Sequence, residues 1–215
     1  GGEVNVGSVE FEEQVKIEVK NLSLKGPNSG TAGDDSDNRS DEATLRKKGI
    51  VNRVSGVTID GFKIAEDDTP LTSGVSIRSG SNDIDSITVK NNIISGMSDS
   101  NSSDFTFGIL SFDNPKTNAG TLSNATVRDN KISDIGVDNS TQGVAVSLEA
   151  LTGSSAGDGA IIENNSISDI STLDQSSPGT GIALRPNFGG GSNGNSAARV
   201  TDDNSFKNVD ISVSH

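Results

Sequence analysis

The chain has 215 residues, with 30 Asp and Glu against 17 Lys and Arg and a formal charge of −13 at pH 7. Ile and Val together number 35 against 10 Leu, a balance typical of strands, which disfavours helical bundles, coiled coils and α/β folds with long amphipathic helices. The acidic balance provides no basic stripe to neutralise phosphates, which argues against nucleic-acid binding. No apolar run approaches the roughly 20 residues of a membrane span.

Residues 1–50 are expected to form entry strands and an acidic loop. Apolar and polar residues alternate over 15–19, which predicts a half-buried strand. The loop that follows contains the densest group of oxygen ligands in the chain, namely Asp34, Asp35, Asp37 and Asp41. Ca²⁺ takes about six to eight such ligands, so these four are candidate calcium ligands. The spacing lacks the central Gly and terminal Glu of an EF-hand, and a solvated acidic loop is the alternative.

Residues 51–215 contain five copies of one motif. The first copy reads Val57-Thr58-Ile59-Asp60-Gly61-Phe62-Lys63-Ile64, and its central apolar residue returns at spacings of 30, 38 and 35 residues. This places Ile59, Val89, Val127 and Ile162 in one column, with a degenerate fifth copy ending at Phe206. A single repeat of this size cannot bury its own apolar edge, so the copies are expected to stack along one continuous core.

A second short strand follows in each period. It is expected at 74–77, 108–111, 143–146, 181–184 and 210–213, with Val75, Ile109, Val144 and Ile182 aligned. The pattern predicts an all-β fold, a parallel β-helix of about six or seven rungs with loop insertions. A rung here means one circuit of the chain around the solenoid. Residues 1–215 are expected to form a single domain.

Polar columns accompany the apolar ones. Asn tolerates left-handed backbone, and its amide can bond the equivalent amide one rung away. A structural asparagine column is therefore expected at a sharp turn, with Gly61 in the same position of the first copy. Facing charges on neighbouring rungs predict ion pairs between Asp60 and Lys90 and between Arg128 and Glu163. The column itself consists of Asn92, Asn130, Asn165 and Asn204.

These rungs resemble the right-handed parallel β-helix repeats of the pectin-lyase-like superfamily. Residues 55–64 match the pattern S-G-V-T-I-x-G-F-x-I, 127–133 match V-x-x-N-x-I-S, and 162–168 match the latter with Ile in the first position. Residues 21–30 resemble the entry rung of cell-surface β-helix proteins. The resemblance implies the fold but no single activity, because this fold hosts lyases, hydrolases, epimerases, adhesins and inert stalks.

The catalytic sets of polysaccharide-active relatives are incomplete in this sequence. The G-H-G and R-x-K motifs of polygalacturonase-like enzymes are missing, and there is no Tyr for an alginate-epimerase-like motif. The sole histidine is His215, the last residue. Arg78 and Arg185 follow the second strand at equivalent positions, but no acidic cluster recurs beside them, so both are interpreted as surface residues. We therefore assign no catalytic residue and no cofactor other than calcium.

These observations favour a non-catalytic extracellular or cell-surface solenoid with a structural role. It would be a filament or adhesin subunit that stacks end to end on copies of itself, or part of a longer solenoid, because apolar alternation continues to 213 and an open rung recruits other strands. One alternative is a lyase, hydrolase or epimerase of the same superfamily. Another is a module that binds surface glycans, in which Phe must replace the absent Trp and Tyr as platforms. Phe105, Phe107, Phe112 and Phe188 could form such an apolar contact patch or pin loops against the solenoid, and pinning is the preferred interpretation.

Overall fold

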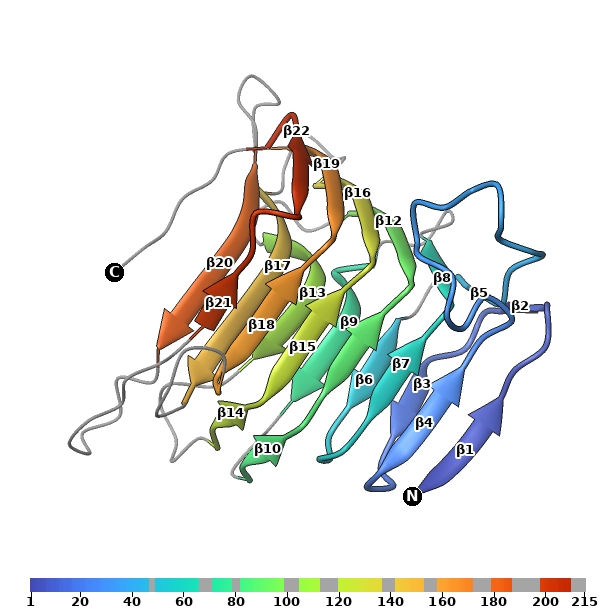
Figure 1. Cartoon of the computed structure of the whole chain (residues 1–215), viewed down its shortest axis with the longest axis horizontal. Coiled ribbons are helices and arrows are strands. Elements are labelled where there is room, and N and C mark those ends of the chain that lie inside the picture. Colours follow the sequence, from blue (N-terminus) through green and yellow to red (C-terminus); the bar gives the residue numbers. More distant parts are fainter. Residues whose placement is uncertain are drawn as a thin grey trace.

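The computed structural model describes residues 1–46, 49–65, 71–78, 82–98, 105–112, 120–136, 142–152, 158–171, 179–186 and 198–209. In these residues all regular structure is β-strand, and the strands wind into a parallel β-solenoid with β1 and β21 toward opposite ends (Figure 1). The predicted fold class is confirmed. The described part of the chain contains no apolar helix with the length of a membrane span.

The strands form three sheets, and every pairing between neighbouring rungs is parallel. Sheet A has the order β1 (Gly2–Asn5), β4 (Leu22–Lys25), β7 (Thr58–Asp60), β11 (Thr88–Lys90), β15 (Ala125–Arg128), β18 (Ala160–Glu163) and β21 (Ala198–Val200). Sheet B has the order β2 (Glu10–Phe11), β5 (Thr44–Leu45), β8 (Lys63–Ala65), β12 (Ile93–Met97), β16 (Lys131–Ile135), β19 (Ser166–Ile170) and β22 (Ser205–Lys207).

Sheet C closes the circuit. Its rungs are β3 (Val15–Ile17), β6 (Ile50–Asn52), β9 (Ser73–Arg78), β13 (Phe105–Phe112), β17 (Gln142–Leu151) and β20 (Thr180–Pro186). Two short strands, β10 (Ile84–Asp85) and β14 (Leu122–Ser123), extend this sheet beyond the end of β17. The chain passes from A to B to C and back to A, so residues one repeat apart in sequence become neighbours across adjacent strands.

The register of sheet A is the one that the repeat spacing predicts. Val89 lies opposite both Ile59 and Val127, and Val127 lies opposite Ile162. The third sheet is different, because Ile109 pairs with Val146 and not with Val144. The predicted alignment of 143–146 was therefore wrong by two residues. Strand side chains alternate with a period of two, so a shift of two residues keeps the same face inward. Such a shift cannot be detected from the alternation of apolar and polar residues in the sequence.

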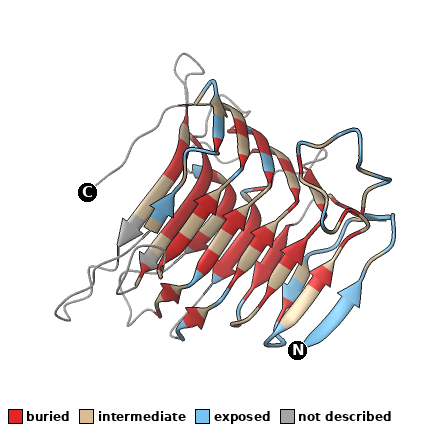
Figure 2. Cartoon of the chain, in the orientation of Figure 1, coloured by how far each residue is buried: buried red, intermediate tan, exposed pale blue. Residues whose placement is uncertain are grey.

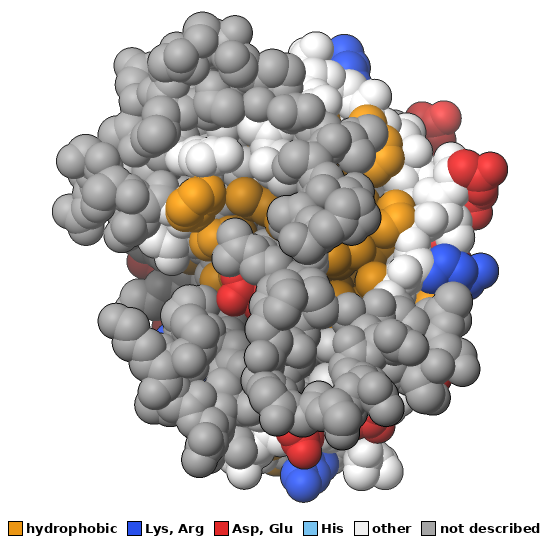
Figure 3. All heavy atoms as spheres, turned by 90° about the vertical axis from the view of Figure 1, so that its left-hand side faces the viewer, with side chains coloured by type: hydrophobic (Ala, Val, Ile, Leu, Met, Phe, Trp, Pro, Cys, Tyr) orange, Lys and Arg blue, Asp and Glu red, His pale blue; other side chains and the backbone are white. Residues whose placement is uncertain are grey.

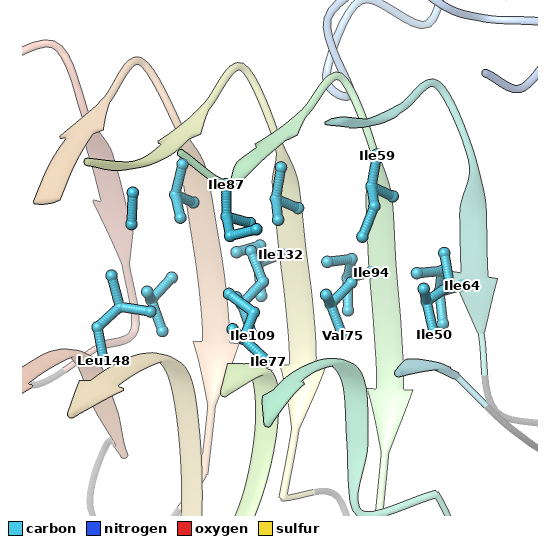
Figure 4. Packing of buried hydrophobic residues seen from close by; sticks show 14 of the residues in the cluster. Ile50, Ile59, Ile64, Val75, Ile77, Ile87, Ile94, Ile109, Ile132 and Leu148 are labelled. Carbon is cyan, nitrogen blue, oxygen red and sulfur yellow. The ribbon is translucent and has the colours of Figure 1, made fainter. Parts of the chain in front are cut away.

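The inward columns form a single hydrophobic core along the solenoid (Figures 2 and 4). Ile59, Val89, Ile64, Ile94 and Ile132 are completely buried. Each such side chain contributes roughly 1.5–3 kcal/mol when it leaves water. The same inward strand positions recur on every rung and are filled mostly by Ile and Val. This repetition explains both the β-branched composition of the sequence and the continuous core.

Candidate functional site

Polar side chains concentrate where the chain leaves sheet A and enters sheet B. We call this region the A–B corner, and it comprises residues 60–62, 90–92, 128–130 and 163–165. The corner repeats on consecutive rungs because β7, β11, β15 and β18 end in register. It is therefore a linear array of turns, and any function located there is built from stacked equivalent residues.

A buried asparagine ladder forms the inner side of this corner. The Nδ2 of Asn92 donates to the Oδ1 of Asn130 over 3.0 Å, Asn130 donates to Asn165 over 3.0 Å, and Asn165 donates to Asn204 over 2.9 Å. Each acceptor Oδ1 also receives the backbone N–H of the asparagine on the preceding rung. The amides are buried and satisfied, so the predicted structural role of this column is confirmed.

The ladder asparagines are not the residues in the left-handed conformation. That conformation belongs to the position before each of them, where Gly61, Asn91, Asp129 and Asn164 have φ values of 80°, 57°, 54° and 53°. Gly61 therefore corresponds to Asn91, and Phe62 takes the ladder position, with its N–H bonded to the Oδ1 of Asn92 over 3.0 Å. The prediction placed Gly61 one column away from its true position. The two adjacent asparagines of the motif serve two separate purposes, a backbone turn and a hydrogen-bond ladder.

Asp60 is a buried carboxylate at this corner. Its oxygens accept hydrogen bonds from Asn91 Nδ2 at 2.7 Å, Ser29 Oγ at 2.7 Å and the N–H of Gly30 at 3.2 Å. The Nζ of Lys90 lies 3.2 Å from it, which confirms the predicted ion pair. Burial acts to raise the pKa of Asp60, but these hydrogen bonds and the charge of Lys90 outweigh it and lower the pKa below 3.8. Asp60 is therefore an ionised structural acceptor and is unsuited to act as a general acid.

The other predicted cross-rung pair is not formed. Arg128 lies opposite Glu163 in the register, yet its guanidinium contacts Asp129, the next residue in the chain. Glu163 instead lies 3.7 Å from Arg199 on the following rung. The left-handed turn brings the Asp129 side chain to the end of the same strand, and this nearer carboxylate takes the guanidinium.

The loop between β4 and β5 covers the outer side of the corner, and Arg39 organises it. The guanidinium forms a bidentate pair with Glu42, with distances of 2.8 and 3.0 Å, and its side chain is only 4% exposed. Nη1 of Arg39 also donates to the carbonyl oxygens of Thr31 at 2.9 Å and Asn91 at 2.8 Å. A buried cation thus ties the loop to itself and to a rung about 50 residues further along the chain. Sequence reasoning missed Arg39, because only its position identifies it among the basic residues.

The same loop approaches the backbone of the solenoid closely. The N–H of Gly33 donates to the carbonyl of Asp129 over 2.8 Å, and a Cβ at Gly33 would lie 2.3 Å from the carbonyl oxygen of Asn92. Asn28 closes the base of the loop, accepting the N–H of Ser40 at 2.6 Å and donating to its carbonyl at 3.1 Å. The acidic segment is therefore a structured cover that bridges several rungs.

The four candidate calcium ligands lie in this cover. Asp34, Asp37 and Asp41 are exposed, and Asp35 accepts the Nδ2 of Asn38 at 2.9 and 3.0 Å. Within the described ranges, no three His, Cys, Asp or Glu side chains are grouped so that they could hold a metal ion. Carbonyl oxygens of Thr31 and Ala32 already accept the Arg39 guanidinium. Calcium binding stays a prediction, which a calcium titration followed by thermal unfolding tests.

A second row of polar residues lies along the short strands β10 and β14. Hydrogen bonds from Ser86, Asn124 and Ser123 lower the pKa of Asp85, and the N–H and hydroxyl of Thr121 lower that of Asp83. Further along the chain, Asn208 and Ser168 do the same for Asp169. These carboxylates, like Asp60, are held ionised as acceptors between rungs.

The remaining candidates lie on sheet C. Arg78 is an exposed residue at the end of β9, as predicted. Arg185 lies in β20, and its side chain is outside the described set, as are Phe188 and His215. The rings of Phe105 and Phe107 stack with centroids 6.1 Å apart, and Phe105 is 47% exposed. Phe112 ends β13, and its side chain is not described.

No family model matches this chain, and no curated protein or solved structure does so either. Function must therefore be argued from the arrangement of residues alone. In that arrangement, amides, carboxylates and a guanidinium join successive rungs and make the solenoid rigid.

Proposed function

We propose that the chain is a non-catalytic structural β-solenoid of the extracellular space or cell surface and a member of the pectin-lyase-like superfamily. The observation that carries this proposal is the use of its polar groups. Asn92, Asn130 and Asn165 bond from rung to rung, and Asp60 and Asp85 are held ionised by donors from neighbouring rungs. General-acid catalysis by a carboxyl group near neutral pH requires a raised pKa, whereas the pKa values of Glu3, Asp60, Asp83, Asp85 and Asp169 are all shifted downward.

The superfamily assignment is supported by the solenoid itself together with the rung sequences. The asparagine ladder lies at the turn that the V-x-x-N-x-I-S pattern marks, since Asn130 and Asn165 are its fourth residues. An extracellular location suits a strongly acidic chain, because charge repulsion would keep such a rod soluble in a salty medium.

A glycan-degradation screen tests the non-catalytic role. The chain is incubated with polyuronates and neutral polysaccharides, with and without Ca²⁺, and unsaturated products and new reducing ends are measured. We expect no turnover above buffer. Turnover that is lost in Arg78→Ala or Arg185→Ala would overturn the proposal and identify an enzyme. Antibody labelling of intact against permeabilised source cells tests the location, and label that appears only after permeabilisation would contradict it.

One observation favours a second candidate, a glycan-binding module. The stacked Phe105 and Phe107 lie at the start of β13 with one ring half exposed, and an exposed aromatic face can pack on the apolar face of a sugar. A glycan array with wild-type chain and Phe105→Ala tests this candidate. Binding that disappears in the variant would establish it, and an array without signal would exclude it for the glycans printed.

A further inference from the structure

The asparagines of the solenoid divide into buried and exposed ones, and the acceptor motif for N-linked glycosylation occurs only among the exposed. This motif is Asn-x-Ser/Thr, where x is not Pro. Within the described ranges it begins at Asn21, Asn38, Asn124 and Asn164, and all four are exposed. No buried asparagine of these ranges begins the motif. Two further copies, at Asn101 and Asn139, lie outside the described residues.

The middle residue of each of these four motifs faces inward. Ala125 and Asn165 are 2% and 1% exposed, Leu22 packs against the hydrophobic core, and the side chain of Arg39 is buried. Seen along the solenoid, hydrophobic side chains occupy the interior and charged side chains lie mostly at the periphery (Figure 3). Since strand side chains alternate, the residue after an inward one faces outward. The fold thus places the acceptor asparagine and the hydroxyl of its motif on the outer surface together.

Two of the acceptors occupy equivalent turns before sheet A. Asn21 and Asn124 have φ values of 58° and 49°, and the equivalent residues on the rungs between them, Gly56 and Ser86, have 74° and 60°. All four are left-handed, and a hydroxyl residue follows each of them at the third position. The turn itself therefore accepts Gly or Ser, and its geometry does not require the asparagine.

From this placement we infer that Asn21, Asn38, Asn124 and Asn164 are sites of N-linked glycosylation. The inference rests on the proposed extracellular or cell-surface location, because a transferase attaches these glycans to chains that are being exported. The asparagine Nδ2 forms a bond to the anomeric carbon of an oligosaccharide carried on a lipid pyrophosphate. The bond from that carbon to the pyrophosphate oxygen breaks, the lipid pyrophosphate leaves, and Nδ2 gives up one proton to a base.

The hydrogen bonds of the acceptors are compatible with this substitution. The Nδ2 of Asn124 donates to Asp85 over 2.6 Å, and the Nδ2 of Asn38 donates to Asp35 over 2.9 and 3.0 Å. A substituted amide keeps one N–H, so each asparagine can still donate to its carboxylate. The glycan would then extend into solvent from the exposed turn or loop.

Asn91 shows which position the fold excludes. It belongs to the same column of the A–B corner as Asn164, with φ values of 57° and 53°, and a ladder asparagine follows both. Asn91 is only 4% exposed, because its Nδ2 bonds Asp60 at 2.7 Å and its carbonyl accepts Arg39 of the covering loop at 2.8 Å. A glycan at Asn91 would displace this loop. The motif is absent there, since Ile93 stands where the Asn164 motif has Ser.

Mass spectrometry of the secreted chain tests the sites. The chain is exported from cultured eukaryotic cells behind a signal peptide, and its glycans are removed enzymatically in heavy-oxygen water, which marks each modified asparagine. We expect marks at all four positions. Thr126→Val and Ser166→Ala each break one motif and keep its asparagine, so each should lose only the mark at Asn124 or at Asn164. A secreted chain without marks at the four positions would overturn the inference.

A matched pair of added motifs separates exposure from the motif alone. Ser86→Asn creates the motif at an exposed left-handed turn and should add one mark. Ile93→Thr creates it at the buried Asn91 and should add none to the secreted chain. Made in bacteria without glycosylation, the Ile93→Thr chain should unfold at the wild-type urea concentration, because Ile93 is only partly buried and Thr keeps the β-branch. A secreted Ile93→Thr chain marked at Asn91 as fully as at Asn164 would contradict the inference.

These outcomes are separable from those of the proposed function. Antibody label on intact source cells, together with a secreted chain that carries no marks, would overturn the glycosylation sites while the location stood. Label that appears only after permeabilisation would overturn the location, and with it the use of the sites in the source cells. Glycan turnover would overturn the non-catalytic role and leave the glycosylation sites unaffected.

Discussion

Asn92 and Asn130, which are 38 residues apart in sequence, share a buried hydrogen bond of 3.0 Å from Nδ2 to Oδ1. Asn130 also donates to the carbonyl of Val89 at 2.9 Å and accepts the N–H of Asn92 at 3.0 Å. One amide therefore satisfies the N–H of Asn92 at the turn and also bonds a carbonyl of the preceding rung. The ladder is the element that lets the chain turn sharply at each rung without leaving buried polar atoms unpaired.

Asn130→Ala should destabilise the chain by about 3 kcal/mol, because it leaves the N–H of Asn92 buried without a partner and removes the hydrogen bonds to Val89 and Asn165. Urea denaturation followed by far-UV circular dichroism measures the change. Asn5→Ala removes an exposed amide that bonds Glu3, and it should cost less than about 0.5 kcal/mol. A loss at Asn130 no larger than that of the control would show that the ladder is not needed for stability.

Asp134 tests the turn positions. Its backbone is left-handed, with a φ of 56°. The equivalent residue one rung earlier is Gly96, which has a φ of 77°. Left-handed backbone costs an L-residue without a local hydrogen bond roughly 1–2 kcal/mol. Asp134→Gly should therefore keep the wild-type free energy of unfolding, and Asp134→Ala should lower it by about 1 kcal/mol. If alanine and glycine are equivalent in urea denaturation, backbone strain does not govern this column.

Arg39 should control the loop between β4 and β5 without controlling the solenoid. Arg39→Ala removes the donors to Glu42, Thr31 and Asn91, so the backbone amide of Gly33, which bonds Asp129, should exchange its hydrogen faster. Arg39→Lys should not restore protection, because an ammonium cannot reproduce the planar bidentate contact. Hydrogen exchange with mass spectrometry measures both loop and core. Equal deprotection of the Ile94 and Ile132 strands would mean that the loop and the solenoid unfold together.

Much of this architecture could be predicted from the sequence, because the solenoid repeats the same environment. The column of Ile59, Val89, Val127 and Ile162 fixed sheet A by spacing alone. Sheet C was placed two residues out at Val144, since a period of two hides such a shift. The role of Arg39 could not be foreseen, because its partners are separated from it by up to 52 residues and belong to no repeat. Contacts made by non-repeating loops cannot be predicted from the periodicity of the sequence.

Acid sensitivity should depend on Asp60. Its pKa in the folded chain lies below its ordinary value of 3.8, because donors from Asn91, Ser29 and Gly30 and the charge of Lys90 outweigh burial. The unfolded chain therefore binds the proton more readily, and the stabilisation by Asp60 is fully present above the unfolded pKa. It is lost as the pH falls through the folded pKa. Asp83, Asp85 and Asp169 share this sign, so the contribution of Asp60 must be isolated by substitution.

Asp60→Asn should lower the free energy of unfolding by about 2 kcal/mol at pH 7, because the amide loses the Lys90 pair and turns a donor toward Asn91 or Ser29. The difference from wild type should shrink as the pH falls below 3.8, because the unfolded wild-type chain then takes up the proton first and the folded carboxylate follows at lower pH. Urea titrations from pH 7 down to about pH 2.5 measure it. Asp34→Asn, an exposed change in the loop between β4 and β5, serves as the control and should give only a small difference at pH 7. A gap between Asp60→Asn and wild type that stays constant with pH would show that Asp60 stabilises the fold by shape and not by its charge.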